Sequence, residues 1–155
     1  MTWRPDLTVA AIVQHDHRFL VVEELIRDCL VFNQPAGHVE DGESILEAVI
    51  RETLEETAWQ FTPRQLLGVY QWRQAQSGQS FLRMAIIGDV TGHDPARSLD
   101  TGIVAAHWMD RDALLAQPQR LRSPLVMRCI DDYLAGQRHS LSALHFLAAQ
   151  PLPQG

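Results

Sequence analysis

Residues 44–57 read Ser-Ile-Leu-Glu-Ala-Val-Ile-Arg-Glu-Thr-Leu-Glu-Glu-Thr, and they are the strongest indication of local structure in the chain. Apolar residues recur there every three or four positions, which is the period of an amphipathic helix. A serine at the start suits the N-cap. We therefore expect a helix from Ser44 to about Thr57. Its core-facing stripe is formed by Ile45, Leu46, Val49 and Ile50.

Three acidic residues of this helix share one patch that begins inside the apolar stripe. At about 100° per residue, Glu56 falls within the stripe, and Glu52 and Glu55 follow it outward. A carboxylate turned toward the core is costly unless a cation compensates it. Acids at spacings of three and four residues also repel one another. The patch therefore suits Mg²⁺ or Mn²⁺, which favour carboxylate ligands, although a solvated acidic face is the alternative for the acids taken alone.

The residues around the acids extend this pattern. Gly37 is followed after five residues by Glu43, and after seven more by Arg-Glu-x-x-Glu-Glu at 51–56. This arrangement resembles the Nudix box, which has the same residues at the same spacing. Much of residues 7–141 also resembles the NudJ-type phosphatase branch of the Nudix family. The segments that carry this wider resemblance are 19–24, 33–38, 71–72, 81–83, 122–126 and 136–138.

The resemblance implies a fold and a reaction. The fold is α/β (α+β), an α/β/α sandwich with a central mixed β-sheet, in a single domain over residues 1–155 whose tail is loosely ordered from about 146. The reaction is Mg²⁺-dependent hydrolysis of phosphoanhydride bonds, with Mn²⁺ as a substitute, in nucleoside tri- and diphosphates and thiamine-related pyrophosphates. Two alternatives stay open. One is a Nudix pyrophosphatase acting on ADP-ribose or a dinucleotide, and the other is a non-catalytic nucleotide-sensing module.

The resemblance also implies roles for residues of the motif. Glu52, Glu55 and Glu56 would bind the metal, and the Gly37 carbonyl would be a further ligand. Either Glu52 or Glu55 could take a proton from the attacking water, and the sequence does not choose between them. Asp100, in a later loop, is a candidate for an additional acid that acts as base or ligand.

Four other positions in or next to the motif have expected structural roles. Arg51 and Glu43 are expected to hold the preceding loop to the helix, with an ordinary exposed ion pair as the alternative. Thr53 and Ala58 depart from the family pattern. Thr53 falls in the core stripe, where its hydroxyl can bond back along the helix. Ala58 stands in place of a glycine and would cost on the order of 1 kcal/mol if the backbone there is left-handed.

Candidate substrate contacts lie on other segments. All 13 basic residues are arginine, so phosphate binding must use arginine, backbone N–H groups or metal. Arg83 is the candidate phosphate ligand, and a surface arginine is the alternative. Trp72 and Tyr70 share a strand face and either stack on a heteroaromatic ring or belong to the core. His38 follows the motif glycine and either faces the phosphates or is a solvated loop histidine.

Composition limits the remaining possibilities. The chain has 155 residues with 46% hydrophobic composition, enough for one domain with a core. A net charge of -6 argues against a nucleic-acid duplex as partner. The absence of lysine excludes Schiff-base chemistry and Walker or kinase lysines. Short apolar runs predict no membrane segment, and hence a cytoplasmic protein. The resemblance implies a small nucleotide or pyrophosphate as substrate, and we expect a monomer or homodimer. Cys29 and Cys129 are expected to be buried free thiols.

Alternation and turn residues predict the other elements. We expect an opening hairpin made of residues 8–13 and 19–22, and a loop at 33–37. Further strands are expected at 30–32, 66–72, 81–90 and 104–109, and further helices at 110–115 and 124–135.

Overall fold

The computed structural model describes residues 2–155 and contains two four-stranded β-sheets. The first, here called the mixed sheet, has the order β5-β1-β7-β6. Its central strands β1 (Asp6–Ile12) and β7 (Ser80–Thr91) run parallel, whereas β5 (Ala36–His38) and β6 (Gln60–Arg73) pair antiparallel with them. The sheet is therefore mixed, as expected.

The second sheet is antiparallel and is centred on β3 (Arg18–Ile26). This strand pairs with β2 (Gln14–His15) and β4 (Cys29–Asn33), and also with β8 (Ile103–Asp110). The strands expected at 30–32 and 104–109 are thus confirmed.

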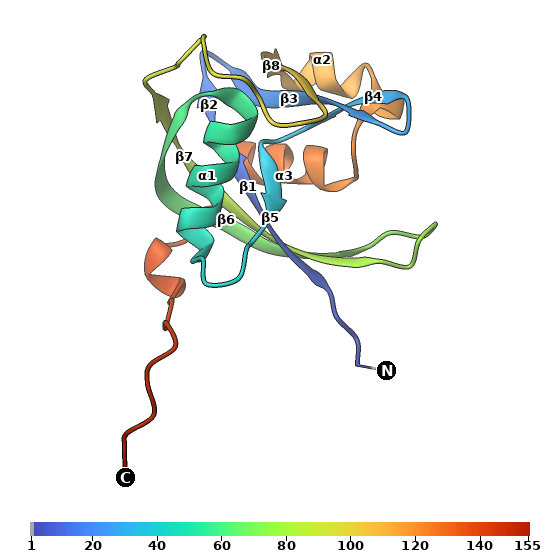
Figure 1. Cartoon of the computed structure of the whole chain (residues 1–155). Coiled ribbons are helices and arrows are strands. Elements are labelled where there is room, and N and C mark those ends of the chain that lie inside the picture. Colours follow the sequence, from blue (N-terminus) through green and yellow to red (C-terminus); the bar gives the residue numbers. More distant parts are fainter. Residues whose placement is uncertain (1) are drawn as a thin grey trace.

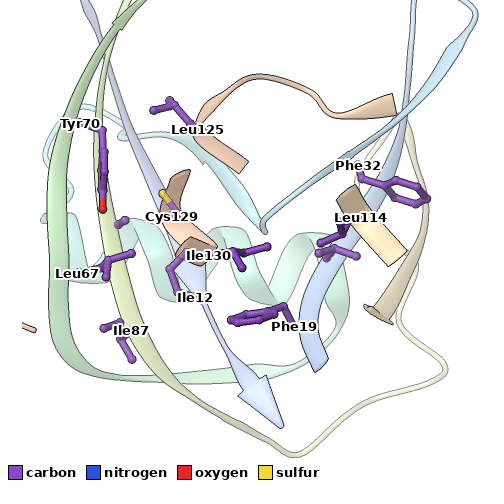
Figure 2. Close-up of a cluster of buried hydrophobic side chains, with 12 residues drawn as sticks. Ile12, Phe19, Phe32, Leu67, Tyr70, Ile87, Leu114, Leu125, Cys129 and Ile130 are labelled. Atoms are coloured by element: carbon purple, nitrogen blue, oxygen red, sulfur yellow. The ribbon is translucent and has the colours of Figure 1, made fainter. Parts of the chain in front are cut away.

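Helices lie on both sides of the mixed sheet (Figure 1). The long helix α1 (Ile45–Thr57) packs on one face, where Val9 and Ile86 meet Val49. Helix α3 (Leu125–Leu134) packs on the other face, where the cluster in Figure 2 joins Ile12 to Ile130. Successive residues of β1 and β7 point to opposite faces, so each strand contributes to both clusters. The expected α/β/α sandwich is confirmed.

Helix α1 begins and ends where the sequence predicts. The Ser44 hydroxyl accepts a hydrogen bond from the Glu47 N–H at 3.1 Å, which caps the helix. Ala58 ends it in the left-handed region at φ 60°. Thr53 is fully buried, and its hydroxyl donates to the Val49 carbonyl at 2.7 Å. Ile50 does not belong to the core stripe: it is exposed, because it lies about 80° from the centre of the stripe.

The expected opening hairpin is wrong in its pairing. Strand β1 pairs with β5 and β7 in the mixed sheet, while β3 belongs to the other sheet. Only the two residues of β2 fold back on β3. The expected loop at 33–37 is also wrong in part, since β5 begins within it at Ala36. Alternating apolar residues indicate a strand but not its partner. Pro35 and Gly37 are typical of loops, so the sequence does not indicate so short an edge strand.

The later elements follow the expectations more closely. Strand β6 begins at Gln60, before the expected start at residue 66. Register shifts near Pro63 and Leu66 interrupt the alternation of side chains there, so the sequence pattern did not indicate this part of the strand. The short helix α2 (Arg111–Leu115) is capped by Asp110, whose carboxylate accepts from the Ala113 N–H at 2.7 Å. After α3, Gly136 takes φ 87°. Two 3-10 turns complete the described elements, at Pro118–Arg120 and Leu141–Ala143.

The remaining expectations concern the tail, the cysteines and membrane segments. Residues 144–155 form no helix or strand, and this end leads away from the sheets in Figure 1. Both cysteines are free, but only Cys129 is buried. Cys29 is exposed because it begins β4 directly after the tight turn at residues 27–28. Within residues 2–155, no helix is long and apolar enough to cross a membrane.

Candidate active site

A cavity of about 340 Å³ opens between the mixed sheet, α1 and the start of α3. Its lining includes acidic, arginine and aromatic side chains. The acids, here called the acidic side of the cavity, are Glu24, Glu40, Glu52, Glu56 and Asp100. The lining also includes Trp72, Phe81, Arg83, Arg122 and Leu125. These groups suit a ligand with phosphate and aromatic parts, provided that a cation offsets the charge of the acids.

The three acids of α1 differ in burial as the helix geometry predicts. Glu56 and Glu52 are 7% and 9% exposed, whereas the Glu55 side chain is 33% exposed. Burial raises the pKa of Glu56 to about 9, and the carboxylate of Glu52 acts in the same direction. Burial also raises the pKa of Glu52. The hydrogen-bond donor to Glu56 is the backbone N–H of Ala36, at 2.8 Å, which is a neutral group.

Arg51 joins the acidic loop to α1 through five hydrogen bonds. Its Nε and Nη2 donate to the two carboxylate oxygens of Glu43 at 2.6 and 2.9 Å, and Nη2 also donates to the His38 carbonyl. Its Nη1 donates to Glu52 at 2.9 Å and to Glu55 at 3.2 Å. The hydrogen bond from Arg51 lowers the pKa of Glu43. The guanidinium therefore fixes the loop before α1 and orients two of the three acids.

The acidic side fits a divalent cation whose shell is completed by other oxygens. Within residues 2–155, no three acidic, histidine or cysteine side chains meet closely enough to enclose a cation by themselves. Mg²⁺, however, keeps several waters and uses one or two carboxylates together with phosphate oxygens. Glu52 and Glu56 are buried carboxylates, and a cation between α1 and β5 would compensate the cost of ionising them.

Arg83 is a buried residue of the cavity wall. It is 5% exposed, and its guanidinium donates to the side-chain oxygens of Gln34 at 2.9 Å and Asn33 at 3.1 Å. The alternative of a surface arginine is excluded. Its position follows from the parallel pairing of β7 with β1, which places Arg83 beside Thr8 at the same wall.

Trp72 and Tyr70 have different surroundings in the structure. Trp72 stacks on Phe81, with ring centroids 5.6 Å apart, and both rings line the cavity. Tyr70 is instead part of the buried cluster in Figure 2 and donates its hydroxyl to Asp132 at 2.7 Å. Tyr70 is therefore a core residue, while Trp72 offers a ring surface to a ligand.

His38 and Asp100 both line the cavity but differ in their surroundings. The His38 side chain is 65% exposed, and its Nε2 lies 3.4 Å from an oxygen of Asp6. Asp100 is held beside α1, because its backbone N–H donates to the Glu55 carbonyl at 2.9 Å. Its carboxylate accepts a hydrogen bond from the Thr101 N–H. Asp100 is thus close to the acids, while His38 is at the rim.

Sequence reasoning missed Glu24 and Arg122 as cavity residues. Glu24 comes from β3, at a bulge in its pairing with β8, and burial raises its pKa. Arg122 precedes α3 and lies near Glu24, where it opposes that rise. Both lie within segments that carry the family resemblance, but their position at the cavity depends on how the two sheets pack. No local pattern could have identified them.

The fold and this cavity agree with comparisons to known proteins. A NUDIX domain model matches residues 4–128, so the chain belongs to the Nudix family. It is a hydrolase of phosphoanhydride bonds, and Nudix hydrolases use divalent cations.

Three individual proteins illustrate this similarity. Phosphatase NudJ of Escherichia coli (strain K12) is 37% identical over 142 residues, which is 92% of each chain. The structure of a NUDIX hydrolase from Nitrosomonas europaea superposes with a TM-score of 0.91 at 47% identity, over 93% of this chain and 98% of that one. The NUDIX domain of Shewanella oneidensis NrtR, complexed with ADP ribose, has a TM-score of 0.68 at 16% identity, over 86% of this chain and 90% of that one, and shows the shared fold.

Proposed function

We propose that this protein is a Mg²⁺-dependent phosphatase of the NudJ type that acts on nucleoside tri- and diphosphates and on thiamine-related pyrophosphates. One observation carries the proposal: a single cavity joins the buried acids Glu52 and Glu56 to the buried cation Arg83. A phosphate chain whose metal is held by these acids would have the Arg83 guanidinium in the same cavity for its other oxygens. The 37% identity to phosphatase NudJ supports a phosphatase activity.

The metal ligands proposed are Glu52, Glu55 and Glu56, together with the Gly37 carbonyl. These groups lie on α1 and β5, which pack against each other. When bound, the ion would neutralise phosphate charge and lower the pKa of the attacking water. Mn²⁺ has similar ligand preferences and is expected to substitute.

The proton of the attacking water is assigned to a carboxylate at this side of the cavity. Glu52 and Glu55 are the first candidates, and Asp100 is the third, since it lies against Glu55. Arg51 and Glu43 are proposed to hold Glu52 and Glu55 in position through the hydrogen bonds described above. A misplaced carboxylate slows such a reaction strongly, because catalysis of this kind depends on positioning.

The substrate is proposed to lie with its phosphates toward Arg83 and its ring against Trp72. A guanidinium forks onto two phosphate oxygens, which suits a buried arginine at the wall of a cavity. The Trp72–Phe81 stack offers a flat apolar surface for a nucleobase or a pyrimidine ring. His38 is proposed as a rim contact to the phosphates.

Phosphate release from a panel of nucleotides and pyrophosphates, measured with Mg²⁺ and with a chelator, tests the proposal. Product masses identify the bond that is cut. We expect release from nucleoside di- and triphosphates only with metal, and its loss in Glu56→Gln. Cleavage of ADP-ribose or a dinucleotide in preference to these would show a different Nudix specificity. Nucleotide binding without any product would favour the non-catalytic module.

A further inference from the structure

The buried charge of Arg83 is held by neutral groups. Its Nη1 donates to the Gln34 amide oxygen at 2.9 Å and lies 3.9 Å from the Cys129 sulfur, and its Nη2 donates to the Asn33 amide oxygen at 3.1 Å. Within residues 2–155, no aspartate or glutamate forms an ion pair with it. Arginines are almost never fully buried without a partner of opposite charge. Among the residues that the structure describes, Arg83 therefore has hydrogen-bond partners but no direct ion-pair partner.

Gln34 is fixed so that only its oxygen can face Arg83. The residue is 2% exposed, and its Nε2 donates to the Val126 carbonyl in the first turn of α3 at 2.9 Å. With the amide nitrogen directed to α3, the amide oxygen points to the guanidinium. Gln34 therefore connects the segment between β4 and β5 to both β7 and α3, and it holds the Arg83 guanidinium by a hydrogen bond.

We propose that Gln34, assisted by Asn33, is a positioning residue that holds Arg83 against the cavity through neutral amide oxygens and so leaves its charge free for substrate phosphate. This inference rests on the role of Arg83 in the proposed function. A glutamate would fill the same space and accept the same hydrogen bond. At this depth its charge would pair strongly with the guanidinium, and the attraction of the cavity for an anion would be lost.

The isosteric variant Gln34→Glu tests this, because it places a negative charge beside Arg83 and retains the shape; it also removes the donor to the Val126 carbonyl, which Asn33→Asp leaves in place. Asn33→Asp is the second variant and reaches the same guanidinium from a less buried position. Gln65→Glu, at an exposed site on β6, is the control for the extra negative charge. Each protein is assayed for KM and kcat with a nucleoside diphosphate and Mg²⁺. Binding of the non-cleavable analogue α,β-methylene-ADP is measured by calorimetry with Mg²⁺, and folding by the melting temperature.

For Gln34→Glu we expect KM and the analogue Kd to rise about tenfold or more, as for the loss of a charge-assisted contact, with kcat within about threefold of the wild-type value. Asn33→Asp should shift both in the same direction, and Gln65→Glu should leave both within about twofold. The melting temperature of Gln34→Glu should fall, because the carboxylate cannot donate to the Val126 carbonyl, although its pair with Arg83 offsets part of this loss.

A folded Gln34→Glu that binds the analogue as tightly as Gln65→Glu does would overturn the inference, even if the wild-type enzyme is active. If Gln34→Glu does not fold, Asn33→Asp decides in the same way. A wild-type protein that binds the analogue but releases no phosphate from any substrate would instead overturn the proposed function. In that case the binding data alone would still support or refute the role of Gln34.

Discussion

A Cβ atom added to Gly37 would lie 2.2 Å from the carboxylate carbon of Glu52. The backbone of β5 and the side chain from α1 are thus in contact at the acidic side of the cavity. Gly37 does not have a positive φ, so the glycine is required for space rather than for backbone conformation. The position of the Glu52 carboxylate therefore requires a residue without a side chain at Gly37.

Gly37→Ala should displace Glu52 and lower kcat about 10- to 100-fold, the range typical of disturbed support around a metal site. Gly136→Ala is the matched control. Gly136 has φ 87°, and a Cβ there would meet nothing within 4 Å. The control should therefore lose about 1 kcal/mol of stability by backbone strain while retaining its kcat. Equal kcat in the two variants would contradict the space argument.

Glu56→Gln should lower metal-dependent phosphate release by roughly 100-fold or more, because it removes a buried carboxylate from the proposed metal site. We also expect Mg²⁺ to raise the melting temperature of the wild-type protein, and Glu56→Gln should reduce this rise. Glu47→Gln is the control: it removes the same charge from an exposed position on the same helix. If Glu56→Gln and Glu47→Gln respond to Mg²⁺ alike, Glu56 is not a metal ligand.

Ala58→Gly should raise the free energy of unfolding by up to about 1 kcal/mol without changing kcat. Ala58 has φ 60°, where an L-residue pays a steric cost that glycine does not. Its methyl group is buried, and losing that contact offsets part of the gain. Ala116→Gly is the opposite control, since Ala116 ends α2 at φ -70° and glycine there should be destabilising. Urea unfolding of the two variants measures both signs.

What the sequence could predict depends on the range of the interactions. The limits of α1 and the burial order of its acids follow from local periodicity and motif spacing, and they were predictable. The left-handed backbone at Ala58 was an open alternative that the structure decides. The surroundings of Arg83 were not predictable. Its contact with Gln34 spans 49 residues, and that of Gln34 with α3 spans 92. These contacts exist only because β1 pairs parallel with β7, whereas alternation alone suggested a hairpin.

The last prediction concerns Glu23 on β3, which binds two partners outside the cavity. Its carboxylate contacts His107 Nε2 at 3.2 Å and accepts a hydrogen bond from Arg120, whose guanidinium lies over the Phe32 ring. The hydrogen bonds to His107 and Arg120 lower the pKa of Glu23 from its ordinary value of 4.5. Between the lowered pKa of the folded state and the ordinary value of 4.5, the unfolded chain therefore binds more protons than the folded one. The free energy of unfolding must then fall as the pH falls.

The contribution of Glu23 should be fully present above about pH 4.5 and should disappear as the pH drops through the lowered pKa of the folded state. Melting temperatures of the wild-type protein and Glu23→Gln, measured from pH 7 to pH 3, check this. The wild-type protein should be more stable at pH 7, by at most about 1 kcal/mol for a partly exposed pair, and the difference should close in acid. Glu47→Gln, which removes an exposed carboxylate, should show no such convergence. A difference between wild type and Glu23→Gln that persists at pH 3 would contradict the assignment of this stability to the ionised carboxylate of Glu23.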